Sequence, residues 1–137
     1  MNAQVQAYPA AEKLVYEILS AAYDGEGYYI APVIPDTLST VTITVQNISG
    51  SPLNIWVDKP VLELSSITSK HISGDAGYGV ADALCHDFWV QLFNARGLQF
   101  ENGVVTAVEV VSDPHRIVDV NVDTYRFATT VRLTVHA

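Results

Sequence analysis

The feature that most constrains the fold is a strict alternation of residues between Tyr125 and His136. One face would carry Tyr125, Phe127, Thr129, Val131, Leu133 and Val135. The opposite face would carry Arg126, Ala128, Thr130, Arg132, Thr134 and His136. Because successive side chains of a strand point to opposite faces, the pattern predicts a long strand with one apolar face. We expect this strand to have an unpaired edge to which a neighbouring subunit could add.

The same alternation marks an earlier part of the chain. Residues 39–46 place apolar side chains on one face and threonines on the other, which is typical of a half-buried strand. Turn-forming residues follow at 47–52, and the alternation resumes over residues 53–57. These two segments are therefore predicted to form a hairpin.

Three more segments have β-type sequences. Residues 28–33 are apolar, but Pro32 cannot donate to a ladder, which favours an edge strand or an irregular arm. After an interruption at Asp58-Lys59-Pro60, residues 61–67 form a further β-type stretch. Residues 104–111 are rich in β-branched side chains and are predicted to form a central strand.

Two segments have the spacing of apolar residues that is typical of helices. Residues 9–23 begin with a proline, which is tolerated in a first helical turn, and are followed by Asp24-Gly25. From Val80 to Leu92 an apolar residue recurs at every fourth position, and Gly97 follows as a stop signal. We expect one helix over each segment.

The order of these elements is helix, several strands, helix, then two strands. It predicts an α+β fold in which two helices cover one face of a mostly antiparallel sheet, with residues 1–137 in a single domain. Residues 69–79 are predicted to form a surface loop. Residues 112–123 are polar and rich in turn formers, so we expect a loop there that is mobile alone and ordered by a partner.

Charge and composition restrict the function. The net charge is −8 and the seven basic residues are scattered, so the sequence lacks the basic patch of a general nucleic-acid binder. Apolar residues make up 49% and charged residues 16%, which points to buried interfaces. The sequence shows no signal peptide and no apolar run of the roughly 18 residues that span a bilayer, so we expect a cytosolic-type protein without membrane contact.

The sequence offers no candidate active site. The histidines at positions 71, 86, 115 and 136 lack the spacing of metal ligands, and a single cysteine accompanies them. Cys85 lies on the apolar side of the predicted second helix, where a small hydrophobic residue is expected, and His86 lies on its polar side. We predict no catalytic residue, no metal and no cofactor, and therefore a protein that is not an enzyme. The single cysteine also suggests a reducing compartment.

The C-terminal third carries a resemblance to a known family. Residues Val108 to Pro114, followed by Asp123 to Val135, resemble the closing hairpin of tail-terminator proteins of long-tailed bacteriophages. The order of the whole chain is similar too, with a starting helix, a proline-interrupted arm, the Asp58-Lys59-Pro60 step and a long second helix. This sequence differs by a Thr- and Ser-rich insertion from about residue 36 to 54.

The resemblance implies a structural protein of the virion tail that is assembled in the host cytoplasm. It would form a homo-oligomeric ring, expected to be a hexamer, that caps the tail tube and stops its polymerisation. Its partners would be the tail tube protein and the head connector protein at the head-tail joining interface. DNA would pass the lumen without specific binding, since six copies would carry about 48 negative charges.

Six residues are candidate contacts with a neighbouring subunit or another partner: Asp113, His115, Arg116, Asp119, Arg126 and Arg132. The first four lie in the predicted loop. The other two share the polar face of the last predicted strand, where arginine could form bidentate pairs with carboxylates of the adjacent subunit. A solvated face is the alternative for these two arginines.

Two other functions stay open at this point. A different head-tail connector or neck protein would share ring symmetry and acidity but bind other partners. A small ligand-binding module or enzyme is less favoured, because the motifs of such proteins are missing.

Overall fold

The computed structural model describes residues 3–32, 40–49, 57–69, 76–118 and 124–136. Their helices are α1 (Ala3–Ala22) and α3 (Gly77–Asn94). Their strands are β1 (Tyr29–Ala31), β2 (Thr42–Ser49), β3 (Val57–Asp58), β4 (Val61–Ser69), β5 (Gln99–Phe100), β6 (Gly103–Ile117) and β7 (Thr124–His136).

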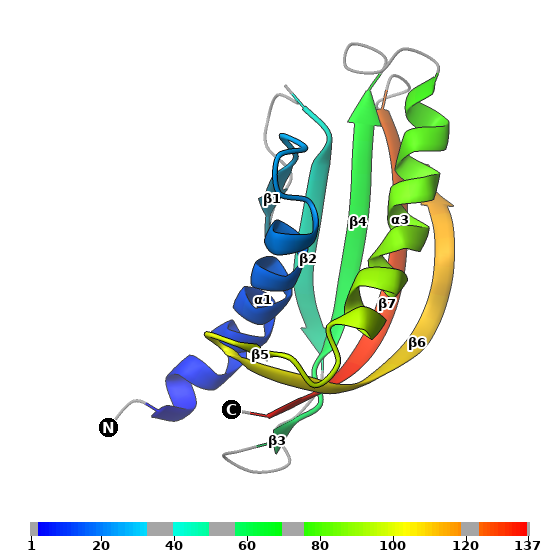
Figure 1. Ribbon diagram of the computed structural model, residues 1–137. Helices are drawn as coiled ribbons and strands as arrows, with labels where there is room; N and C mark the ends of the chain where they lie inside the picture. The colour runs from blue at the N-terminus through cyan, green and yellow to red at the C-terminus, as the bar shows by residue number, and fades with distance from the viewer. Residues whose placement is uncertain (1–2, 33–39, 50–56, 70–75, 119–123, 137) are drawn as a thin grey trace.

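The strands form one curled sheet with the order β1-β2-β4-β7-β6-β5, and β3 also pairs with β7. β1 runs parallel to β2, and every other pairing is antiparallel. Figure 1 shows α1 and α3 on the same face of this sheet. The predicted α+β fold, with two helices on one face of a mostly antiparallel sheet, is confirmed.

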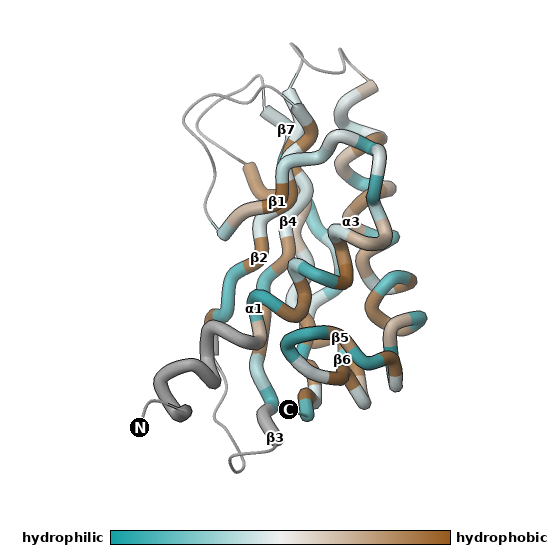
Figure 2. Tube along the Cα trace, turned by 60° about the vertical axis from the view of Figure 1, so that its left-hand side comes forward, coloured by the Kyte–Doolittle hydropathy of each residue, from teal (hydrophilic) through white to brown (hydrophobic). Residues whose placement is uncertain are grey.

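The core lies between the helices and this face of the sheet. Among its fully buried side chains, Leu14 comes from α1, Ile43 from β2, Leu64 from β4, Phe88 from α3 and Leu133 from β7. Figure 2 shows how apolar and polar stretches alternate along α3, so that one stripe of the helix can be buried.

Both predicted helices are present, and each begins earlier than its pattern suggested. α1 starts six residues before Pro9, and α3 starts three residues before Val80. The predicted stop after the second helix is confirmed. Gly97 adopts a φ of +81°, and the Arg96 side chain donates to the Phe93 carbonyl.

The predicted hairpin between residues 39–46 and 53–57 is wrong. β2 pairs with β1 and β4, whereas Val57 in β3 pairs with β7. Residues 50–56, which include most of the predicted second strand, lie outside the described residues. Alternation shows that a segment is a strand, but it does not name the partner strand.

The predicted positions of the last two strands within the sheet are also wrong. β7, which was expected to have an unpaired edge, is central because it lies between β4 and β6. β6, which was expected to be central, is bordered by β5 only at Gly103 and Val104. Its remaining residues form the described edge of the sheet on that side.

Part of the predicted loop over residues 112–123 is a strand. β6 continues through Ile117, although bulges shift its register against β7 between Val110 and His115. A strand can accommodate Pro114 and other turn-forming residues at such bulges. The composition of this segment therefore resembles a turn although the strand continues. Residues 119–123 lie outside the described residues, as do residues 70–75 of the other predicted loop.

Candidate partner-binding surface

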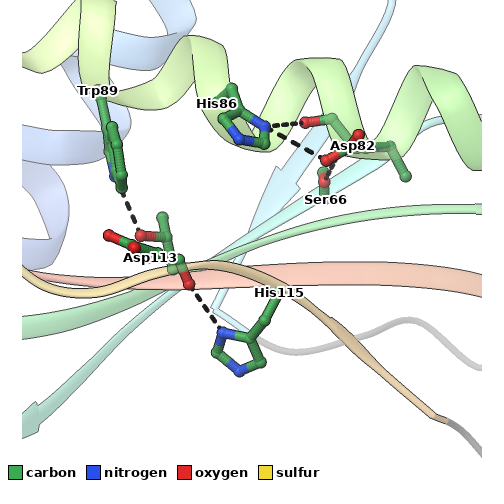
Figure 3. Close-up of polar contacts among 8 residues, drawn as sticks. Ser66, Asp82, His86, Trp89, Asp113 and His115 are labelled. Carbon is green, nitrogen blue, oxygen red and sulfur yellow. Dashed lines mark hydrogen bonds and ion pairs between the residues drawn. The ribbon is translucent and has the colours of Figure 1, made fainter.

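The second half of β6 holds three of the six predicted contact residues: Asp113, His115 and Arg116. All three are exposed. The His115 ring lies next to its own strand, with Nδ1 at 2.9 Å from the Asp113 carbonyl oxygen (Figure 3). Asp119 lies outside the described residues.

Arg116 lies over an aromatic cluster that the sequence did not reveal. Its guanidinium carbon is 5.4 Å from the ring centre of Tyr78 and 5.9 Å from that of Tyr125. Tyr78, at the start of α3, also meets Tyr125 and Phe127 edge to face, with ring centres 5.8 and 5.1 Å apart. Arginine and tyrosine grouped at a surface are the residue types that dominate binding at protein interfaces.

Arg126 and Arg132 both have carboxylate partners within the chain. Arg132 Nη1 lies 2.9 Å from Glu109 Oε2, directly across the β6–β7 ladder. Arg126 Nη2 lies 3.4 Å from Glu63 Oε1 and 3.2 Å from the hydroxyl of the buried Ser65. The structure therefore places all three carboxyl and hydroxyl partners on neighbouring strands, and the predicted pairs with an adjacent subunit stay a prediction.

Polar groups between α3 and the sheet form hydrogen bonds that fix the position of α3 on β4, β6 and β7. The Trp89 indole on α3 donates to the hydroxyl of Thr129, at 3.0 Å, and that hydroxyl donates to the Ser112 carbonyl on β6. On β4, Thr68 donates to the Gly77 carbonyl at 2.8 Å. The alternation over residues 125–136 correctly places Thr129 on the face toward the helices, but it contains no signal for its hydrogen-bond partners.

A carboxylate also joins the two helices. Asp87 of α3 accepts hydrogen bonds from the Tyr23 hydroxyl, at 2.7 Å, and from Gln91. Burial and this bond raise the pKa of Tyr23 above its ordinary value. Asp87 and Gln91 are both half-buried, and Asp87 faces Tyr23, the residue directly after α1.

Those of the residues considered for chemistry that the structure describes do not assemble a reactive site, and His71 lies outside the described residues. Cys85 is buried, as expected, and burial together with nearby Asp82 raises the pKa of its thiol to about 12. His86 is exposed and lies 3.2 Å from Asp82 on the same helix (Figure 3). Within the described ranges, no three His, Cys, Asp or Glu side chains are grouped so that they could hold a metal ion.

One shallow groove lies beside the edge strand β1. It has a volume of about 260 Å³. It is lined by Glu12, Lys13, Tyr16, Ile30, Ala31, Pro32 and Val45. Most of its wall is apolar and open to the outside, so it is suited to covering by another chain more than to enclosing a small molecule. No described helix is long and apolar enough to cross a membrane.

Comparisons with known proteins give a likeness in structure only. No protein-family model and no curated protein sequence matches the chain. A solved structure of the "Virion of native gene transfer agent (GTA) particle" contains a similar chain, with a TM-score of 0.59 and 17% sequence identity. The match covers 90% of this chain and 92% of that chain, so the two share their fold over nearly their whole lengths.

Proposed function

We propose that this protein is a structural component of a phage-like virion and, more narrowly, that it caps the tail tube as a tail terminator. The observation that carries the proposal is the likeness in fold to a chain of a gene transfer agent particle over nearly the full length of both chains. The resemblance of the C-terminal strands to tail terminators supports the narrower role.

In this role the protein acts through interfaces. Copies of the chain form a ring, one face of the ring binds the last layer of tube subunits, and the other binds the head connector. An acidic lumen repels DNA and lets it slide, which agrees with the net charge of −8. The cluster of the exposed Arg116 and Tyr78 with the half-buried Tyr125 is a candidate contact with one of these partners.

Deletion of the gene from the element that encodes the particle tests the proposal. We expect full heads, no joined particles and tail tubes of uncontrolled length, because nothing caps the growing tube. Electron micrographs of the lysate measure the tube lengths. Complementation from a plasmid is the control, and it should restore joined particles.

The same experiment separates the alternative role. Deletion of a connector or neck protein would leave unjoined tails of normal length. Purified particles that lack this protein by mass spectrometry would contradict both roles and favour an unrelated binding module.

A further inference from the structure

β1 lies at one edge of the sheet, and the second half of β6 lies at the opposite edge. The cross-strand register places these two segments in the same rows of paired residues. One continuous row of paired residues crosses the sheet, and it runs through Ile30, Ile43, Ser66, Phe127 and Arg116. The rows on either side join Tyr29 to Ile117 and Ala31 to His115 in the same way. The short strand β1 is therefore level with the last three residues of β6.

The backbone groups at the two ends of this row both point out of the sheet. The Tyr29 amide donates to the Val41 carbonyl at 2.9 Å, so Tyr29 faces β2 and the next residue, Ile30, faces away from it. At the other side, the Leu133 amide donates to the Pro60 carbonyl at 3.0 Å. The backbone groups of every second residue of β7, counted from Leu133, therefore form their hydrogen bonds with β4.

Phe127 belongs to this β4-bonded set, because it lies six residues before Leu133. Its partner across the β6–β7 ladder, Arg116, is consequently not bonded to β7, and its amide and carbonyl point outward. Ile30 and Arg116 thus present one free donor and one free acceptor each, at the same level, on opposite edges. Among the described residues, no strand pairs with the outer side of β1 or with β6 beyond Val104.

The strand directions are also compatible. β1 runs parallel to β2, and β2, β4, β7 and β6 alternate in direction, so β1 and β6 run in opposite directions. A second copy placed beside the first in the same orientation would bring the two edges together as an antiparallel pair. Pro32 and Pro114, which cannot donate, would end the ladder on one side.

Apolar and aromatic side chains near the two edges are exposed to solvent, and a contact between the edges would cover them. Val118, directly after β6, is 83% exposed, and Tyr29 in β1 is 48% exposed. The groove between α1 and β1 is lined by Ile30. A strand added next to β1 would place its own helix-facing side chains beside this groove. Covering these groups removes apolar surface from water.

We infer that copies of this chain join head to tail by sheet extension, with residues 115–117 of one copy pairing antiparallel to residues 29–31 of the next, so that Arg116 lies opposite Ile30. The inference rests on the proposed ring-forming function and names its subunit contact. A contact between two different edges leaves one edge of each copy free to bind a further copy. The copies close into a ring when the rotation between neighbouring copies divides a full turn. Its short length and the bulges of β6 discourage open-ended pairing with other strands.

A disulfide between copies tests the register. In the inferred pairing, residues 29 and 117 form a non-hydrogen-bonded pair whose side chains lie on the same face, with Cα atoms about 4.5 Å apart. This spacing lies within the range that a disulfide spans. The test variant carries Tyr29→Cys and Ile117→Cys, and the control variant carries Tyr29→Cys and Arg116→Cys, whose side chains would point to opposite faces. Cys85 stays in both, because it is buried and its thiol has a raised pKa.

We expect the oxidised test variant to give a ladder of linked species on denaturing gels that ends in one closed product. The control should give about tenfold less linked dimer, because its geometry is outside the disulfide range. Electron microscopy of the unmodified protein runs in parallel. Rings without linkage, or equal linkage in the control, would overturn the inference and leave the proposed function standing. Absence of assembly in any form, alone or with the tube and connector proteins, would overturn both.

Discussion

At the scale of single residues, two ion pairs on the sheet differ mainly in burial. The Arg126 and Glu63 side chains are 18% and 29% exposed, whereas Arg132 and Glu109 are 43% and 64% exposed. Arg126 also donates to the hydroxyl of Ser65, which has no solvent exposure. An exposed pair in water contributes little, but a buried hydroxyl that loses its partner is costly.

We therefore expect Arg126→Ala to lower the free energy of unfolding by about 1–2 kcal/mol. Arg132→Ala should change it by less than about 0.5 kcal/mol, because that pair is screened by solvent. Urea denaturation of both variants as isolated subunits measures the difference. Equal losses would show that burial does not distinguish the two pairs.

Cys85 predicts a dependence of stability on pH. Its pKa is raised from 9.0 to about 12 in the folded chain by burial and by Asp82. Above about pH 9 the unfolded chain loses this proton while the folded chain keeps it, so stability is complete below pH 9 and falls as pH rises toward 12. The slope attributable to one such group is about 1.4 kcal/mol per pH unit.

The difference between the native protein and Cys85→Ala isolates the contribution of the thiol and of its smaller effect on the pKa of Tyr23. We expect the stability gap between them to narrow steadily from pH 9 upward in denaturation curves recorded at several pH values. A constant gap would mean that the thiol is accessible to water in the folded chain.

At the scale of elements, the turn between β5 and β6 depends on a glycine. Gly103 has a φ of +134°, and an added Cβ would lie 2.5 Å from the backbone oxygen of His136 at the end of β7. Backbone cannot move away as the tip of a side chain can. Gly79 in α3 offers a matched contrast, since an added Cβ there would meet nothing within 4 Å.

We expect Gly103→Ala to lower the free energy of unfolding by about 2–3 kcal/mol, through strain at the turn and displacement of the β6–β7 ladder. Gly79→Ala should raise it by about 0.5–1 kcal/mol, because alanine is favoured over glycine in a helix. Thermal and urea unfolding of the two variants should move in opposite directions. A loss of similar size in both would contradict the prediction.

One carboxylate, that of Asp87, adds a hydrogen bond between α3 and the residue directly after α1. Tyr23→Phe removes the donor to Asp87 and should cost about 1.5 kcal/mol, because the acceptor is charged and only partly hydrated. Tyr16→Phe is the control, since Tyr16 is 49% exposed and should change stability by only a few tenths of a kcal/mol. Equal stability of the two variants in urea would show that the hydrogen bond between Tyr23 and Asp87 does not stabilise the packing of the helices.

At the scale of the whole molecule, net charge opposes association. Each copy carries −8, and both arginines that were candidates for pairing across subunits already have carboxylate partners in their own chain. Repulsion between acidic copies is weakened by salt, since the Debye length falls from about 10 Å at 0.1 M to about 3 Å at 1 M. A contact made of backbone hydrogen bonds and apolar side chains depends less on salt.

We expect self-association to strengthen when the salt concentration rises from 0.05 to 0.5 M, by about tenfold in the association constant. Sedimentation at several protein concentrations measures it. Association that weakens with salt would instead support arginine–carboxylate pairs between copies, which is the prediction made from the sequence for Arg126 and Arg132.

The pattern of residues was enough to predict the fold class, both helices and most strands, because burial of one face imposes a period that local composition reveals. The pattern over residues 125–136 identified β7 and the face that packs against the helices. The termination after α3 was also readable, because a glycine that can adopt a positive φ is a local requirement.

Which strands are neighbours could be seen only in the folded chain. Alternation is the same for a central and an edge strand, so it could not place β7 in the middle of the sheet and β6 near its edge. It also could not reveal that Arg116 stacks on tyrosines, or that Ile30 and Arg116 end the same row on opposite edges. These relations depend on contacts between residues far apart in the chain, and their registers are set by how all the strands pack together under the two helices.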